Sequence, residues 1–194
     1  MTPFTRFFAL LAAGALALLA GCASTYTLDN TVQSFVQAGT IATPATYRFD
    51  RLPSQQSPIQ AQLEAMADPA LNAAGLRRDD ANPRYAVQIS ARTEQTLSPW
   101  ADPWGGFGWG AWGWRRRWGM GFGSRIDDPP WYHREVNVVV RDLGSNKVVF
   151  ESRAISDGPY FDAAKVFPAM FTAALQGFPN PPPGPRTVNI EVPS

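Results

Sequence analysis

The sequence predicts an α+β fold, a single domain in which two helices lie on one face of a mostly antiparallel sheet, in the order β-α-β-loop-β-β-α-β. Two stretches, 59–71 and 161–177, repeat apolar residues at helical spacing. Stretches that alternate apolar and polar residues lie before and after each of them. Two helices that cover one face of a sheet bury the apolar sides of both.

The first half of the domain reads as strand, helix and strand. Residues 46–49 alternate and predict a strand, and residues 85–91 predict another that extends to about 96. Ser57 and Pro58 supply an N-cap and a first helical position, and Gly75 supplies a helix end. Pro69 predicts a kink near Asp68. The expected apolar face of this helix consists of Ile59, Leu63, Met66, Ala67 and Leu71.

The second half reads as a hairpin, a helix and a last strand. Residues 135–141 and 147–154 alternate, and the five-residue connection 142–146 contains a glycine, which is a strong hairpin signal. A helix is expected over 161–177, ending at Gly177. Residues 188–192 predict a short final strand. The domain as a whole is assigned to 44–194.

The N-terminus has the pattern of an export signal. Arg6 is followed by an apolar run at 7–19, which is shorter than the roughly 20 residues that span a membrane but has the length of a signal-peptide core. The run closes with Leu19-Ala20-Gly21-Cys22, which resembles the lipobox of bacterial lipoproteins. This resemblance implies a signal peptide at 1–21, cleavage before Cys22, and covalent attachment of lipid, palmitate among the acyl chains, to Cys22.

Residues 22–43 follow the lipidated cysteine and are mostly polar. We interpret them as a lipidated tether that leads into the domain, although Val32, Phe35, Val36 and Ile41 could instead add an edge strand. Ala23 and Ser24 favour the outer membrane, with the domain facing the periplasm. The membrane is thus the expected partner, through the lipid.

Composition excludes several kinds of chemistry. Cys22 is the only cysteine, so the domain has no disulfide and no thiolate metal site. The 17 basic residues nearly balance the 16 acidic ones, which argues against nucleic acid as a partner. No cofactor is expected apart from the covalent lipid.

Several short patterns identify the chain with a known family. A helix ends in Leu71-Asn72-Ala73-Ala74-Gly75-Leu76, and Pro83-Arg84-Tyr85-Ala86-Val87 leads into the next strand. The hairpin strands Val138-Val139-Val140-Arg141-Asp142 and Lys147-Val148-Val149-Phe150-Glu151 follow. With the lipobox and Tyr47-Arg48-Phe49, they resemble the DUF4136 lipoproteins over roughly 25–193. The resemblance implies an α+β domain in the cell envelope and carries over no catalytic residue.

Candidate catalytic groups are few. His133 is the only histidine, and Asp127 or Asp128 could orient it as a general base. The pairs Asp127/Asp128 and Asp157/Asp162 could serve a periplasmic hydrolase that acts on a cell-wall component. The adjacent prolines and Gly158 instead favour turns, and Asp162 suits a helix start. We therefore expect a non-enzymatic protein, with the hydrolase as the alternative.

A Trp/Gly-rich loop is the remaining candidate site. All seven tryptophans lie between 100 and 131, interleaved with glycines and an arginine run, within an expected loop insertion at 98–132. Such a loop could contact lipid, bind an envelope protein or glycan, or be a structural excursion that packs on itself. The proposed binding residues are Trp104, Trp109, Trp112, Trp114, Arg115, Arg116, Arg117 and Trp118. The expected function is that of an envelope accessory or binding module.

Overall fold

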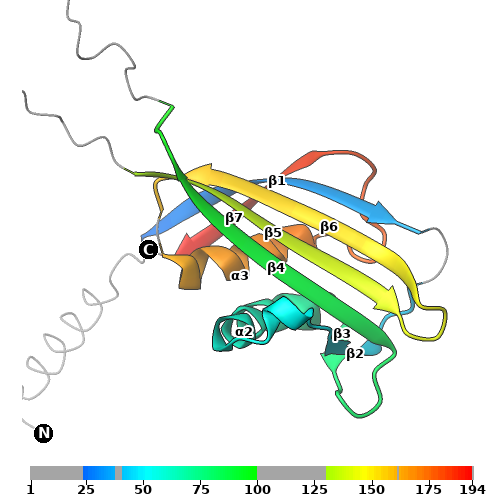
Figure 1. Ribbon diagram of the computed structural model, residues 1–194. Coiled ribbons are helices and arrows are strands. Elements are labelled where there is room, and N and C mark those ends of the chain that lie inside the picture. Colours follow the sequence, from blue (N-terminus) through cyan, green and yellow to red (C-terminus); the bar gives the residue numbers. More distant parts are fainter. Residues whose placement is uncertain (1–23, 38–40, 100–129, 161, 194) are drawn as a thin grey trace, which may run out of the picture.

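The computed structural model describes residues 24–37, 41–99, 130–160 and 162–193 (Figure 1). Within them lie seven strands, two α-helices and one short 3-10 helix. The strands are β1 (Thr25–Val36), β2 (Ala45–Phe49), β3 (Leu76–Arg78), β4 (Tyr85–Thr96), β5 (Trp131–Asp142), β6 (Lys147–Gly158) and β7 (Arg186–Pro193). The helices are η1 (Pro53–Gln55), α2 (Pro58–Ala73) and α3 (Ala163–Ala174). The predicted α+β class is confirmed.

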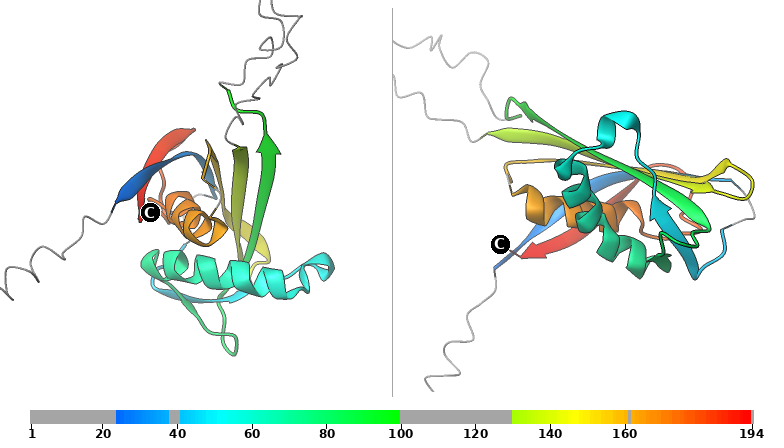
Figure 2. Two further views of the ribbon diagram at one scale, coloured as in Figure 1. Left: turned by 90° about the vertical axis from the view of Figure 1, so that its left-hand side faces the viewer. Right: turned by 60° about the horizontal axis from the view of Figure 1, so that its bottom comes forward.

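The strands form one sheet in the order β3-β2-β4-β5-β6-β1-β7. The sheet curves, and both helices lie against its concave side (Figures 1 and 2). Helix α3 packs on β1, β5, β6 and β7, while α2 packs on β3, β4 and α3. The core between the two layers includes Val136, Val138 and Val140 from β5 and Met170 and Phe171 from α3.

The sheet is mixed, whereas the sequence predicts a mostly antiparallel one. Strand β2 pairs in parallel with β3 on one side and with β4 on the other. The cause is helix α2, which carries the chain from the end of β2 back to the level where β2 began, and strands joined by such a crossover run parallel. The four other strand pairs are antiparallel.

The prediction of a tether at 22–43 is wrong for the residues that form strand β1. Residues 25–36 pair with β6 on one side and β7 on the other, so they form an interior strand rather than a linker or an edge strand. The alternation of Leu28, Asn30, Val32 and Ser34, all buried, explains the assignment. The polar members hid this pattern, since buried asparagine and serine look like linker residues in a sequence.

Helix α2 begins and ends as predicted. Ser57 accepts a hydrogen bond from the Gln60 backbone N–H at 3.3 Å, and Gly75 adopts a φ of 87° after the last turn. The helix runs through Pro69 without a break near Asp68. Ile59 is 76% exposed, so the predicted apolar face is wrong at that position.

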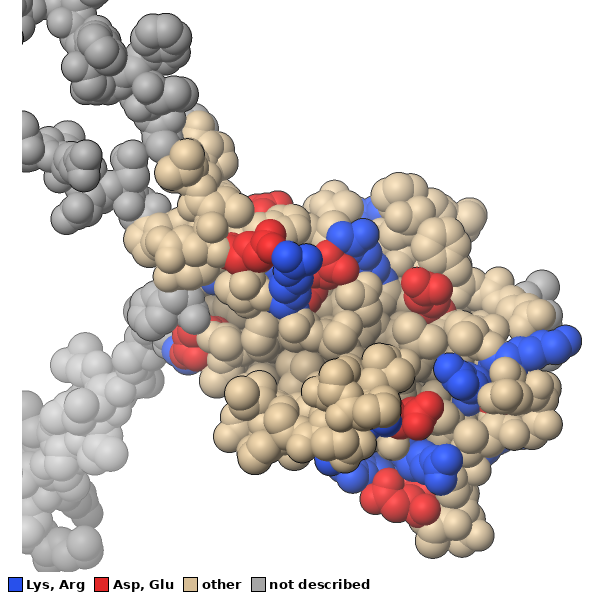
Figure 3. All heavy atoms as spheres, viewed as in Figure 1, with Lys and Arg blue, Asp and Glu red and all other residues tan. Residues whose placement is uncertain are grey.

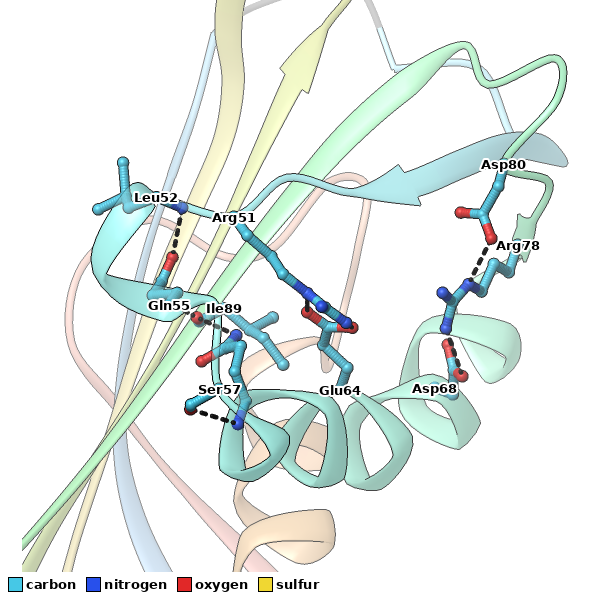
Figure 4. A network of polar contacts seen from close by, with 10 residues as sticks. Arg51, Leu52, Gln55, Ser57, Glu64, Asp68, Arg78, Asp80 and Ile89 are labelled. Carbon is cyan, nitrogen blue, oxygen red and sulfur yellow. Dashed lines mark hydrogen bonds and ion pairs between the residues drawn. The ribbon is translucent and has the colours of Figure 1, made fainter.

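Polar side chains share the inward face of this helix with the apolar residues that are buried there. Glu64 is 1% exposed and receives two hydrogen bonds from Arg51, at 2.5 and 2.6 Å (Figure 4). Gln60 donates to the carbonyl of Ile89 at 3.2 Å. These contacts attach α2 to the end of β2 and to β4, and they satisfy the buried polar atoms that the helix turns inward.

The hairpin and the second helix follow the prediction with shifted bounds. β5 and β6 are joined at 143–146, where Asn146 has a φ of 56°. Helix α3 begins after Asp162, whose carboxylate accepts from the Ala164 N–H at 3.1 Å, and it runs through Pro168. Strand β5 already starts at Trp131, so the predicted loop at 98–132 is two residues too long at that end.

Candidate functional site

Five strand ends meet at one end of the sheet, which we call the loop end. β1 begins there at Thr25, opposite the end of β7 at Pro193. β4 finishes there at Thr96 opposite Trp131, the first residue of β5, and β6 finishes there at Gly158 opposite Tyr132. Figure 1 shows the start of β1, the end of β4 and the start of β5 at this end of the sheet.

Three tyrosines line the concave side of the loop end. Tyr26 and Tyr160 stack with ring centroids 3.9 Å apart, and Tyr132 lies on the neighbouring part of β5. Partial burial raises the pKa of Tyr26, and the Asp162 carboxylate raises it further. The Tyr26 hydroxyl therefore stays protonated at neutral pH and is available as a hydrogen-bond donor.

Arg134 lies beneath these rings on the same face of β5. Its side chain is only 2% exposed, and its guanidinium carbon lies 4.9 Å from the centroid of the Tyr132 ring. Burial lowers the pKa of Arg134, partly offset by Tyr132, Tyr26 and Asp157. Its Nη1 is buried and has no hydrogen-bond partner in the described chain. Alternation explains its inward direction, since Arg134, Val136, Val138 and Val140 share one face.

Two further buried polar residues lie in the same cross-strand row. Ser156 of β6 pairs directly with Arg134. On the next strand, the pairing of β1 with β6 ends at Thr31 and Ile155, and Asn30 and Ser156 are the residues that follow this last pair on the two strands. Asn30 and Ser156 are 0% and 1% exposed, and the Asn30 Oδ1 and Ser156 Oγ atoms have no hydrogen-bond partner among the described residues. We call Arg134, Ser156 and Asn30 the Arg134 row.

Other buried polar side chains of the sheet, farther from the loop end, do have hydrogen-bond partners. Ser34 and Ser152 lie on the same concave face and share a hydrogen bond of 2.9 Å. Ser152 also donates to the Ala174 carbonyl at 2.6 Å, and Arg186 donates to Ser34 at 3.3 Å. Burial lowers the pKa of Arg186, yet this guanidinium has protein acceptors. The Arg134 row thus differs from this second group of buried residues, because its three buried polar atoms have no hydrogen-bond partner in the described chain.

The convex side of the loop end carries the histidine and one predicted aspartate. His133 Nδ1 lies 2.7 Å from Asp157 Oδ1, because the two residues pair across β5 and β6. Asp162 instead caps α3 on the concave side, so the predicted pair Asp157/Asp162 is engaged in two separate contacts. Asp127 and Asp128, the other predicted pair and the expected partners of His133, lie outside the described residues.

Two further charge pairs lie on the convex face. Arg153 of β6 bonds to Glu135 of β5, and the Asn137 amide is the main reason why the pKa of Glu135 is lowered. Arg92 and Glu94 form another such pair. In the view of Figure 3, basic and acidic side chains are interspersed rather than gathered by sign.

The described residues contain neither a metal-binding cluster nor a membrane-spanning helix. No group of three or more His, Cys, Asp or Glu side chains is arranged to hold a metal ion there. In the same ranges, no helix is both long enough and apolar enough to cross a membrane.

Most residues singled out from the sequence lie outside the described chain. This applies to the lipidation site Cys22 and to the whole proposed binding set from Trp104 to Trp118, with Arg115, Arg116 and Arg117. The Arg134 row was missed, because the strand was predicted to begin at Glu135. Extending the alternation by one position would have placed a charged residue on the buried face, and that is the signal that could have found it.

The comparison with known proteins gives a family. Residues 31–180 match the family described as Domain of unknown function (DUF4136), and the chain belongs to that family. No curated protein matches the sequence.

Solved structures resemble the chain at low sequence identity. The PelC dodecamer from Paraburkholderia phytofirmans matches in two crystal structures, one with 13% identity and a TM-score of 0.46 over 75% of this chain and 94% of that one. The other has 12% identity and a TM-score of 0.47, over 79% and 99%. A PDZ domain protein from Parabacteroides distasonis gives 11% identity and a TM-score of 0.51, over 95% of this chain. The chain spans 42% of that protein's length.

Proposed function

We propose that the chain is a membrane-anchored envelope lipoprotein, acylated at Cys22, which acts as a non-enzymatic accessory or binding module at the periplasmic side of the outer membrane. The observation that carries the proposal is the place where β1 begins. Thr25 is already paired in the sheet, at the loop end. A chain spans at most about 3.5 Å per residue, so three residues keep Thr25 within roughly 11 Å of an acylated Cys22.

This short connection supports a defined orientation of the domain. With a tether of some twenty residues, any side of the domain could face the membrane. With three, the loop end faces it, and so do the two strand ends that flank the Trp/Gly segment. Tryptophan favours the headgroup region of a bilayer, and three arginines would each add about 1 kcal/mol of attraction to anionic lipid. We therefore place the binding function of that segment at the membrane surface.

The contacts of Asp157 and Asp162 support a non-enzymatic role over the hydrolase alternative. A carboxylate pair that cleaves glycosidic bonds must flank one shared substrate position. Asp157 contacts His133 on the convex face, while Asp162 caps a helix on the other face. A murein or ester hydrolase activity that is lost in both Asp157→Asn and Asp162→Asn would contradict this part of the proposal.

Metabolic labelling tests the anchor. Cells that express the full chain are grown with an alkyne analogue of palmitate, and membrane and soluble fractions are compared for the wild type, Cys22→Ser and the matched control Ser24→Ala. The proposal predicts label and membrane retention for the wild type and Ser24→Ala, and loss of both for Cys22→Ser. An unlabelled wild type, or a labelled Cys22→Ser, would contradict it.

In-cell crosslinking followed by mass spectrometry tests the binding role. The wild type is compared with Trp112→Ser/Trp114→Ser, both fully acylated, after photo-crosslinking to labelled lipid and to envelope proteins. A specific adduct that the double variant loses supports a binding module. Identical adducts from the two chains would contradict it.

A further inference from the structure

Every polar side-chain atom that is buried without a partner in the described chain belongs to the Arg134 row. These atoms are Arg134 Nη1, Ser156 Oγ and Asn30 Oδ1, on residues that are all 2% exposed or less. Buried polar groups in folded proteins nearly always have partners, so three exceptions on adjacent strands call for a common explanation. Their residues are brought together by the register of β5, β6 and β1.

The charge of the row points to an anion. Arg134 makes no ion pair within the described residues, and the nearby carboxylates are engaged elsewhere, Asp157 by His133 and Asp162 by the start of α3. A buried, unpaired charge is costly, and a water molecule would supply a hydrogen bond without compensating the charge. The ring of Tyr132 offers only partial compensation through a cation–π contact.

The donors and acceptors of the row narrow the class of anion. A guanidinium can only donate, a serine hydroxyl can do either, and a carbonyl oxygen can only accept. The Asn30 amide is oriented by its Nδ2, which donates to the carbonyls of Leu28 and Val188 at 3.0 and 3.2 Å, so the free atom is the oxygen. The matching ligand therefore carries anionic oxygens for Arg134 and an O–H group for Asn30.

We propose that the Arg134 row binds a phosphate group that keeps one P–OH, either as inorganic phosphate or as the monoester headgroup of a lipid. The anionic oxygens accept from Arg134 Nη1 and Ser156 Oγ, and the P–OH donates to Asn30 Oδ1. Sulfate has nearly the same size and shape but no O–H at neutral pH. Sulfate is therefore the control anion: a site that requires the P–OH group prefers phosphate, whereas a general attraction between charges does not. The site does not depend on acylation of Cys22.

Thermal unfolding of the full chain in detergent micelles tests the proposal at pH 6 and constant ionic strength. A ligand that binds only the folded state raises Tm in proportion to the logarithm of its concentration. We expect inorganic phosphate to raise Tm by several degrees, and sulfate to need about tenfold higher concentration for the same rise, which corresponds to one lost hydrogen bond to a charged group. No rise, or equal rises with both anions, overturns the proposal.

Substitutions test whether the rise in Tm with phosphate depends on the Arg134 row. Arg134→Gln should abolish the response to phosphate and Ser156→Ala should weaken it, while Arg153→Gln, a matched change on the exposed convex face, should leave it unaltered. Because Arg134→Gln could disturb folding, the wild type is also followed by NMR of its arginine side chains during a phosphate titration. Saturable shifts confined to Arg134 support the site. Shifts spread over exposed arginines alone contradict it.

Vesicles distinguish the two sources of phosphate. At pH 6 a phosphomonoester is about half protonated and keeps a P–OH, whereas a phosphodiester has none. Acyl-chain-matched vesicles containing phosphatidic acid or phosphatidylglycerol are added to the full chain, and the Arg134 signals are recorded. Shifts with phosphatidic acid alone assign a lipid headgroup, and shifts with inorganic phosphate alone assign the free anion. Shifts with phosphatidylglycerol as large as those with phosphatidic acid overturn the P–OH requirement.

Discussion

Replacing Arg134 with methionine should stabilise the protein in phosphate-free buffer. The guanidinium is 2% exposed and its Nη1 has no partner in the described chain, so the folded state bears a desolvation cost without an ion pair in return. Replacing even a buried ion pair with apolar groups of similar volume is often neutral or stabilising by about 1–4 kcal/mol, and Arg134 has no ion-pair partner within the described residues to offset its desolvation. The lost contact with the Tyr132 ring subtracts about 0.5–1 kcal/mol. The net gain expected is about 1–2 kcal/mol, or roughly 2–8 °C in Tm for a domain of this size.

Urea unfolding of Arg134→Met and of the wild type, followed by far-UV circular dichroism, measures this gain. Arg153→Met is the control, because Arg153 is half exposed and its pair with Glu135 lies at the surface, where such pairs contribute about 0–1 kcal/mol. A loss of more than about 1 kcal/mol in Arg134→Met would refute the reasoning. It would mean that the guanidinium makes a stabilising contact and that the row is structural.

Three further predictions concern the rest of the fold. Phe150→Ala removes a buried ring that packs edge-to-face on Phe178, and should lower the free energy of unfolding in urea by about 3–5 kcal/mol; a loss below 1 kcal/mol would show that the site is not well packed. Asn146→Val should cost about 1–2 kcal/mol and Asn146→Gly should not, because a φ of 56° is left-handed; equal unfolding midpoints would contradict this. Hydrogen bonds lower the pKa of Glu135, mainly from Asn137, and of Asp142, mainly from the Ser145 N–H. Since both pKa values lie below the ordinary 4.5 and 3.8, the stability that they contribute is present above those values and is lost as the pH falls through the native pKa values; denaturation curves that coincide at pH 6 and pH 3 would contradict it.

The elements with strong local signals could be predicted from the sequence. Local residue patterns predict the start of α2 at Ser57-Pro58, its end at the following glycine, and the hairpin connection at 142–146. The structure has each of these features at the predicted place. The parallel pairing of β2 could not be read in this way, because it depends on where α2 returns the chain. For β1 the sequence favours a tether and allows an edge strand only as the alternative, because the inward positions of β1 include the polar residues Asn30 and Ser34.

The candidate site could not be predicted from any single segment of the sequence. Asn30 of β1 is far in sequence from the hairpin strands that carry Arg134 and Ser156, and only the sheet register brings the three residues together. The contact between His133 and Asp157 has the same origin. Sequence composition did single out Cys22 and the tryptophan-rich segment. The structure adds that the start of β1 and the ends of β4 and β5 that flank this segment meet at the loop end (Figure 1).

The orientation of the loop end toward the membrane is the central claim, and tryptophan fluorescence tests it most directly. All seven tryptophans lie between 100 and 131, so their emission reports on this part of the chain alone. The acylated full chain is reconstituted into liposomes with lipids brominated near the headgroup or deep in the acyl chains. We predict a blue-shifted emission that shallow bromines quench more strongly than deep ones, since indoles favour the interface. Emission that neither lipid quenches, from protein that is fully acylated at Cys22, would contradict the account.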